Sequence, residues 1–131
     1  MSVNKEGIAP LTPRRWLLLD AAGALLSVLI LGLLIPVVRT FFGFPLDMLY
    51  VLAVIPAGYI VVDLIGYFVI GGDGRRVLRF VAICNFLYCL VAIGMAINHA
   101  STLTVWGWVY VSVEVLVIAT LAAVEMRVAL R

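Results

Sequence analysis

Charged residues are scarce in this chain. Only 12% of its 131 residues are Asp, Glu, Lys or Arg, whereas 66% are hydrophobic, and the mean hydropathy is +1.23. A soluble domain carries about 25% charged residues, so the composition is typical of a membrane protein whose first partner is the lipid bilayer. The net charge of +2 and the lack of a Lys/Arg run give no basis for a nucleic-acid partner, and we expect none.

Histidine and cysteine are also rare. The one histidine, His99, falls in a short connection between apolar runs, which argues against bis-histidine haem, histidine-rich zinc and di-iron sites within one chain. Cys84 and Cys89 are five residues apart, so they point to different sides of a helix. They form no Cys-x-x-Cys motif. We therefore expect no bound metal and no cofactor.

Long apolar runs dominate what is present. Crossing about 30 Å of hydrocarbon takes roughly 20 helical residues, and four runs meet this length, near 16–38, 48–70, 77–97 and 103–124. The short connections between them force neighbouring helices to be antiparallel. The sequence predicts an all-α integral membrane protein, a four-helix up-down-up-down bundle over residues 16–131. A polar lead-in, residues 1–15, precedes it.

Basic residues predict the orientation of this bundle. In an even-span topology only Arg39 falls on one side, and the other side holds Lys5, Arg14, Arg15, Arg75, Arg76, Arg79, Arg127 and Arg131. Cytoplasmic connections carry the excess of Lys and Arg in membrane proteins. We expect both termini to be cytoplasmic, with the protein in a bacterial cytoplasmic (inner) membrane.

Each predicted span carries one polar stripe. Glu114 is the most informative member, because a carboxyl group at bilayer depth is costly and normally faces a protein interior. The other polar residues fall three, four or seven positions apart, which places them on one face of their helix. The candidate ligand- or proton-binding residues are Glu114, Asp63, Asn85, Asp20, Tyr59, Tyr67, Tyr88 and Tyr110.

Their depths predict a pocket that opens to the cytoplasmic side, reaches the midplane and is closed on the outer side. No Lys or Arg lies deep in any span to pair with these acids. We expect Glu114 to be protonated at neutral pH and to donate a hydrogen bond to a carbonyl, to Asn85 or to a tyrosine hydroxyl. The alternative for these residues is a hydrogen-bonded clamp that fixes the packing of the helices.

Two further residues are interpreted structurally. Pro56 interrupts the second span, removes the backbone bond to the Leu52 carbonyl and predicts a kink. Glu125 follows the last predicted span and is close to Arg127 in sequence, so we interpret it as an interfacial charge.

Three short sequence patterns are similar to those of a known group of proteins. Trp16-x3-Asp20-x2-Gly23, Asn85-x2-Tyr88 and Tyr110-x3-Glu114 are spread over most of the chain, which resembles a group of small four-span bacterial membrane proteins. The resemblance implies the four-span fold and no activity. Small multidrug transporters have this chain length too. However, their essential Glu is in the first helix, whereas the deep Glu here is in the fourth, so we do not assign the chain to them.

Three functions fit these observations. The first is a bundle that binds a small lipophilic or cationic ligand, a proton or a cation, as in a small transporter, which one four-helix chain would perform more readily as a homodimer. The second is an intramembrane enzyme acting on a lipophilic substrate, with Asp63 and Glu114 as an acid/base pair. The third is an accessory or assembly subunit of a membrane complex. We favour the first.

Overall fold

A computed structural model describes residues 12–70 and 72–131, and every regular element in these ranges is a helix. The three longest unbroken helices are α4 (Leu46–Phe68), α5 (Arg75–Asn98) and α6 (Val105–Ala129). The first span consists of three consecutive pieces, α1 (Pro13–Leu29), η1 (Ile30–Leu34) and α2 (Ile35–Val37). A short helix, α3 (Arg39–Phe42), leads into α4.

Four helices are long and apolar enough to cross a membrane, as the sequence predicted. The first of them, Pro13–Val37, begins earlier than the predicted position 16. Thr12 caps it, since its hydroxyl accepts a hydrogen bond from the Arg15 backbone N–H at 3.2 Å, and Pro13 occupies the first turn. The last part of the predicted lead-in therefore belongs to α1, and residues 1–11 lie outside the described residues.

The first span contains a turn that the sequence analysis did not predict. Segment η1 is a π-helix, in which the Ile35 N–H bonds to the Ile30 carbonyl five residues earlier. Pro36, which has no N–H, follows directly in α2. Such widened turns insert one residue into a helix without ending it, so the span continues to Val37.

The outer face of the bundle is apolar. Large hydrophobic side chains on all four spans are exposed on it, among them Leu33, Val54, Leu90 and Leu116. Exposed apolar side chains on all four spans fit contact with lipid. It agrees with a membrane-embedded protein.

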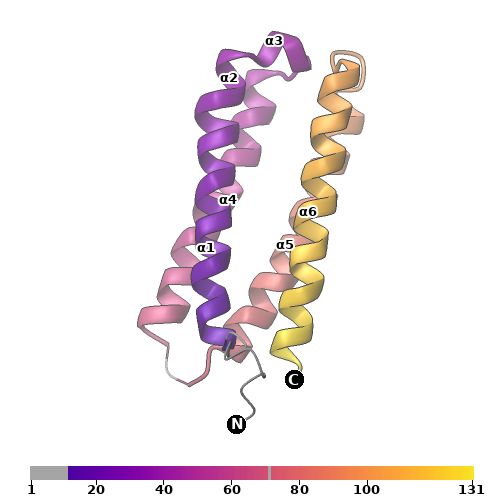
Figure 1. The fold of residues 1–131 in the computed structure, drawn as a ribbon. Coiled ribbons are helices and arrows are strands. Elements are labelled where there is room, and N and C mark those ends of the chain that lie inside the picture. Colours follow the sequence, from indigo (N-terminus) through magenta and orange to yellow (C-terminus); the bar gives the residue numbers. More distant parts are fainter. Residues whose placement is uncertain (1–11, 71) are drawn as a thin grey trace, which may run out of the picture.

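The helices associate as two pairs. Helix α1 packs along α4, and α5 packs along α6, whereas α1 and α6 make few contacts with each other (Figure 1). Between the pairs, a core that includes Leu52, Tyr88 and Val111 fills the half of the bundle remote from the C-terminus. This arrangement leaves a seam between α1 and α6.

The starts of α1 and α5 gather with the ends of α4 and α6. Arg14 donates from its Nε to the Tyr67 carbonyl oxygen at 2.8 Å, and its guanidinium lies 5.1 Å from the centre of the Tyr67 ring. At the same end of the bundle, one buried cluster contains Leu17 from α1, Leu78 from α5 and Val128 from α6. Residues from the start and the end of the described chain therefore meet at this end of the bundle (Figure 1).

Asp73 organises the turn before α5. Its Oδ1 accepts a hydrogen bond from the Arg75 backbone N–H at 3.0 Å, and its Oδ2 lies 3.1 Å from Arg75 Nε. The backbone hydrogen bond and the guanidinium charge of Arg75 lower the pKa of the exposed Asp73 carboxyl below its usual range. Asp73 therefore stays ionised at neutral pH and accepts the first N–H of α5 from just before the N-cap residue, Gly74.

At the opposite end, α3 is held against the start of α6. The Thr104 backbone N–H donates to the Phe42 carbonyl oxygen at 3.1 Å, and the Thr104 hydroxyl donates to the Phe41 carbonyl at 2.8 Å. Gly43 ends α3 with φ of 74°, a conformation that favours glycine. Gly107 is buried, and a Cβ atom at this position would collide with the Phe42 carbonyl oxygen.

We predict that Gly107→Ala lowers the free energy of unfolding by about 1–3 kcal/mol, because the obstacle is backbone that cannot rotate away. The matched control is Gly94→Ala, since a Cβ on Gly94 in α5 has nothing within 4 Å. In the control the loss of glycine flexibility stabilises the helix by about 0.5–1 kcal/mol. Unfolding of both variants in detergent micelles measures the difference. Equal effects would show that α3 is not fixed against α6.

Candidate functional site

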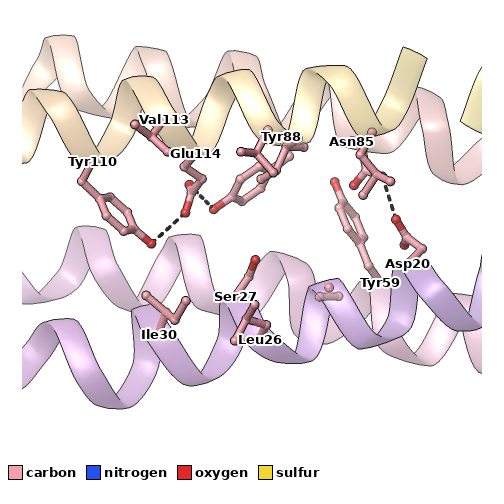
Figure 2. A pocket seen from close by; sticks show the side chains of 15 residues that line it. Asp20, Leu26, Ser27, Ile30, Tyr59, Asn85, Tyr88, Tyr110, Val113 and Glu114 are labelled. Carbon is pink, nitrogen blue, oxygen red and sulfur yellow. Dashed lines mark hydrogen bonds between the residues drawn. The ribbon is translucent and has the colours of Figure 1, made fainter. Parts of the chain in front are cut away.

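A cavity of about 260 Å³ lies in the seam between α1 and α6, with α4 and α5 behind it. Most of its lining is apolar, from residues such as Ile30, Val117 and Leu121. Six of the eight predicted site residues line it: Asp20, Tyr59, Asn85, Tyr88, Tyr110 and Glu114 (Figure 2). Asp63 and Tyr67 do not line it.

The rim of this pocket is on the side of the bundle. Leu26, Val113 and Val117 line the pocket and are also exposed on the outer surface, by 58%, 56% and 59%. These side chains face the region that lipid would occupy. The pocket therefore has a lateral mouth between α1 and α6.

Both ends of the pocket are packed. Beyond Asp20, the buried cluster of Leu17, Leu78 and Val128 fills the end that carries the described chain terminus, Arg131. At the other end the Tyr110 ring packs edge-on against Phe42 and Phe44, with ring centres 5.8 and 5.7 Å apart. The sequence predicted an opening at the first of these ends, which is wrong for the described residues, because helix periodicity does not reveal how tightly the helix ends pack.

Glu114 is the polar centre of the pocket. The Tyr88 hydroxyl lies 2.9 Å from its Oε1, and the Tyr110 hydroxyl lies 3.0 Å from its Oε2 (Figure 2). Tyr88 comes from α5 and Tyr110 from α6, one turn before Glu114. Two hydroxyl donors on two carboxylate oxygens form a preorganised site for a negative charge.

The same groups accommodate protonated Glu114. The Tyr88 hydroxyl also lies 3.4 Å from the Leu52 carbonyl oxygen, which Pro56 leaves without its helical N–H donor. When Glu114 carries a proton and donates it to the Tyr88 oxygen, Tyr88 can turn its own proton to Leu52. Glu114 therefore has hydrogen-bond partners in both charge states, and Pro56 leaves the Leu52 carbonyl free to accept the Tyr88 proton in the second state.

A second polar cluster lies nearer the C-terminal end, with one residue from each span. Asp20, Asp63, Asn85 and Glu125 are all at least 95% buried. The Asn85 amide donates to Asp20 Oδ1 at 3.0 Å and to Glu125 Oε1 at 2.8 Å. Asp63 is a neighbour of Asp20 and has no hydrogen-bond partner for either carboxyl oxygen. Each of the four spans therefore contributes one side chain to this buried polar cluster, which we call the polar level.

Glu125 corrects the sequence analysis, which interpreted it as an interfacial charge close to Arg127. The side chain is 0% exposed and bonds to Asn85. Helix α6 continues to Ala129, so Glu125 is inside the helix rather than beyond it. The signal in the sequence was its spacing, because eleven residues are about three turns, which puts Glu125 on the same face as Glu114.

Asp63 and Glu114 belong to different clusters. Glu114 bonds to Tyr88 and Tyr110, whereas Asp63 is next to Asp20. They do not form the acid/base pair that the enzyme hypothesis requires. Their spans were predicted correctly, but their separation depends on how the helices are staggered.

The remaining two predicted tyrosines make contacts away from Glu114. Tyr59 donates its hydroxyl to the Cys84 carbonyl at 2.6 Å and lies between Asn85 and Tyr88 along the pocket (Figure 2). Tyr67 lies at the bundle end, where its carbonyl oxygen accepts a hydrogen bond from Arg14 and its ring lies beside the Arg14 guanidinium. It does not line the pocket. Tyr67 therefore helps to fix the start of α1.

Comparisons with known proteins leave this site to be interpreted from its geometry. No protein-family model matches the chain, and no curated protein or solved structure is significantly similar to it. Among the described residues, no group of three or more His, Cys, Asp and Glu side chains is arranged to hold a metal ion.

Proposed function

We propose that this protein binds a small lipophilic cation in the pocket between α1 and α6, and that Glu114 is its counter-charge. One observation carries this proposal. Glu114 is a carboxyl group held by two tyrosine hydroxyls in a mostly apolar pocket, with no Lys or Arg among the residues that line it. The ligand would supply the missing positive charge.

The pocket walls fit such a ligand. Apolar lining from Leu26, Ile30 and Val117 favours a hydrophobic body, and the faces of Tyr88 and Tyr110 attract a cation. A cavity of about 260 Å³ suits a molecule of roughly a dozen heavy atoms rather than a large lipid. The lateral mouth would let the ligand enter from the bilayer.

The proposed setting is a bacterial cytoplasmic membrane with both termini on the cytoplasmic side. The support is the accumulation of basic residues at one end of the bundle, in particular Arg14, Arg15, Arg75, Arg76 and Arg131. The pocket has one lateral mouth and two packed ends, so a single copy binds a ligand without connecting the two membrane faces. Transport would need a homodimer facing across this mouth.

The test uses benzyltrimethylammonium, a permanent cation that neither donates a hydrogen bond nor loses a proton. We expect purified protein in micelles to bind it, and Glu114→Gln to weaken binding at least tenfold, because the amide has the same shape but no charge. Asp47→Asn is the matched control, since Asp47 is an exposed acid that does not line the pocket. It should bind as the wild type does.

Neopentylbenzene, the neutral isostere of the same cation, separates charge from shape. We expect it to bind weakly and equally to wild type and Glu114→Gln. Equal binding of the cation to both proteins would contradict the proposal. If Glu114→Gln changed only the stability of the bundle, Glu114 would be a packing clamp, as expected of an assembly subunit.

A further inference from the structure

The pocket does not account for Asp63 and Glu125. Neither residue lines it, yet both side chains are completely buried. Within residues 12–70 and 72–131, four buried carboxyl oxygens have no hydrogen-bond partner: Asp20 Oδ2, Asp63 Oδ1, Asp63 Oδ2 and Glu125 Oε2. A buried carboxylate oxygen without a donor is costly, so donors are missing from this cluster.

The surrounding helices do not supply these donors. Asn85 on α5 provides two N–H bonds for the six carboxyl oxygens. The other titratable side chains near Asp20 are Tyr59 on α4 and Cys84 on α5, and the Tyr59 hydroxyl is already donated to the Cys84 carbonyl. In the part of the chain that the structure describes, no arginine forms an ion pair with the cluster.

Protons on the carboxyl groups themselves are the simplest missing donors. Asp20 connects the other two acids, because one Asn85 amide joins it to Glu125 and Asp63 is its neighbour. Three neighbouring negative charges in a buried interior would repel one another strongly. Two protons would reduce the total charge to one and create two O–H donors for the Asp20 carboxylate.

We propose that Asp20, Asp63 and Glu125 form a two-proton binding site, in which protonated Asp63 and Glu125 donate hydrogen bonds to the Asp20 carboxylate. No covalent bond other than O–H is involved, and the cluster keeps one negative charge. Asp20 alone of the three lines the pocket. The site therefore fixes a negative charge on Asp20, at the end of the pocket nearer Arg131. This charge does not depend on the ligand proposed for Glu114.

Infrared spectroscopy of the protein in lipid at neutral pH tests the proton positions. Protonated and ionised carboxyl groups absorb separately, and transfer to deuterated buffer identifies the protonated ones. We expect Asp63→Asn and Glu125→Gln each to remove the signal of one protonated carboxyl group. Asp20→Asn should instead remove the signal of one carboxylate. Absence of protonated signal from both Asp63 and Glu125 would overturn the proposal.

Stability gives a second measurement if a variant folds poorly. An amide N–H can replace the carboxyl O–H as donor to Asp20, so Asp63→Asn and Glu125→Gln should melt close to wild type. Asp63→Ala and Glu125→Ala should melt well below their amide counterparts. Equal loss in amide and alanine variants would overturn the donor roles. A wild-type melting temperature that rises with added sodium or calcium, but not in Glu125→Gln, would replace the protons by a bound metal cation.

Discussion

Asn85→Leu should lower the free energy of unfolding by about 3 kcal/mol, because the change removes both N–H donors that bridge Asp20 and Glu125. Leucine fills a similar volume, so the loss comes from hydrogen bonding rather than from a cavity. Leaving a buried polar group without its partner costs about 1–3 kcal/mol, and more when the group is charged. Two carboxyl groups lose a donor here.

Equilibrium unfolding in micelles measures this loss. The matched control is Asn98→Leu, the same substitution near the end of the same helix, where the side chain is exposed. We expect the control to change stability by less than about 0.5 kcal/mol. If the two variants were equally stable, the amide bridge between α1 and α6 would contribute nothing, and the polar level would not hold the two helix pairs together.

Helix periodicity explains why most of the site was predictable. Asp20, Tyr88 and Glu114 each face the interior because exposed polar groups are costly at bilayer depth, and this rule needs only the position along one helix. The composition likewise predicted the four spans. The existence of the four spans and the inward direction of these three side chains therefore follow from local sequence.

Glu125 shows where this reasoning failed. The last span was predicted to end at position 124, one residue before Glu125, whereas α6 continues to Ala129. Hydropathy falls near a buried acid, so the boundary was placed too early and the acid was interpreted as an interfacial charge. The charge of Glu125, which makes its burial informative, is thus also the reason that the predicted span ended before it.

The arrangement of the helices was not predictable from single spans. Which helices pair closely, and which leave a seam, depends on contacts between residues far apart in the sequence, such as Leu17 with Leu78 and Val128. The sequence thus predicted a pocket but not its lateral mouth between α1 and α6. It also placed Tyr67 in the pocket, because the interaction with Arg14 is made across 53 positions.

Affinity for benzyltrimethylammonium should rise with pH, which is the most direct test of the role of Glu114. The cation needs ionised Glu114, so over the pH range in which free Glu114 is protonated, a proton must leave when the cation binds. Linkage then requires the affinity to rise about tenfold per pH unit, or about 1.36 kcal/mol. Titration calorimetry in buffers of different ionisation enthalpy counts the released protons.

Two variants separate the contributions to this pH dependence. Glu114→Gln has no proton to release, so its residual binding should not vary with pH. Tyr88→Phe keeps the carboxyl group but removes the donor 2.9 Å from Oε1, so it should weaken binding severalfold while still releasing one proton. A wild-type affinity independent of pH would contradict exchange at Glu114. Release of two protons would mean that the cluster around Asp20 also loses one, because no other buried carboxyl group in the described residues is near the pocket.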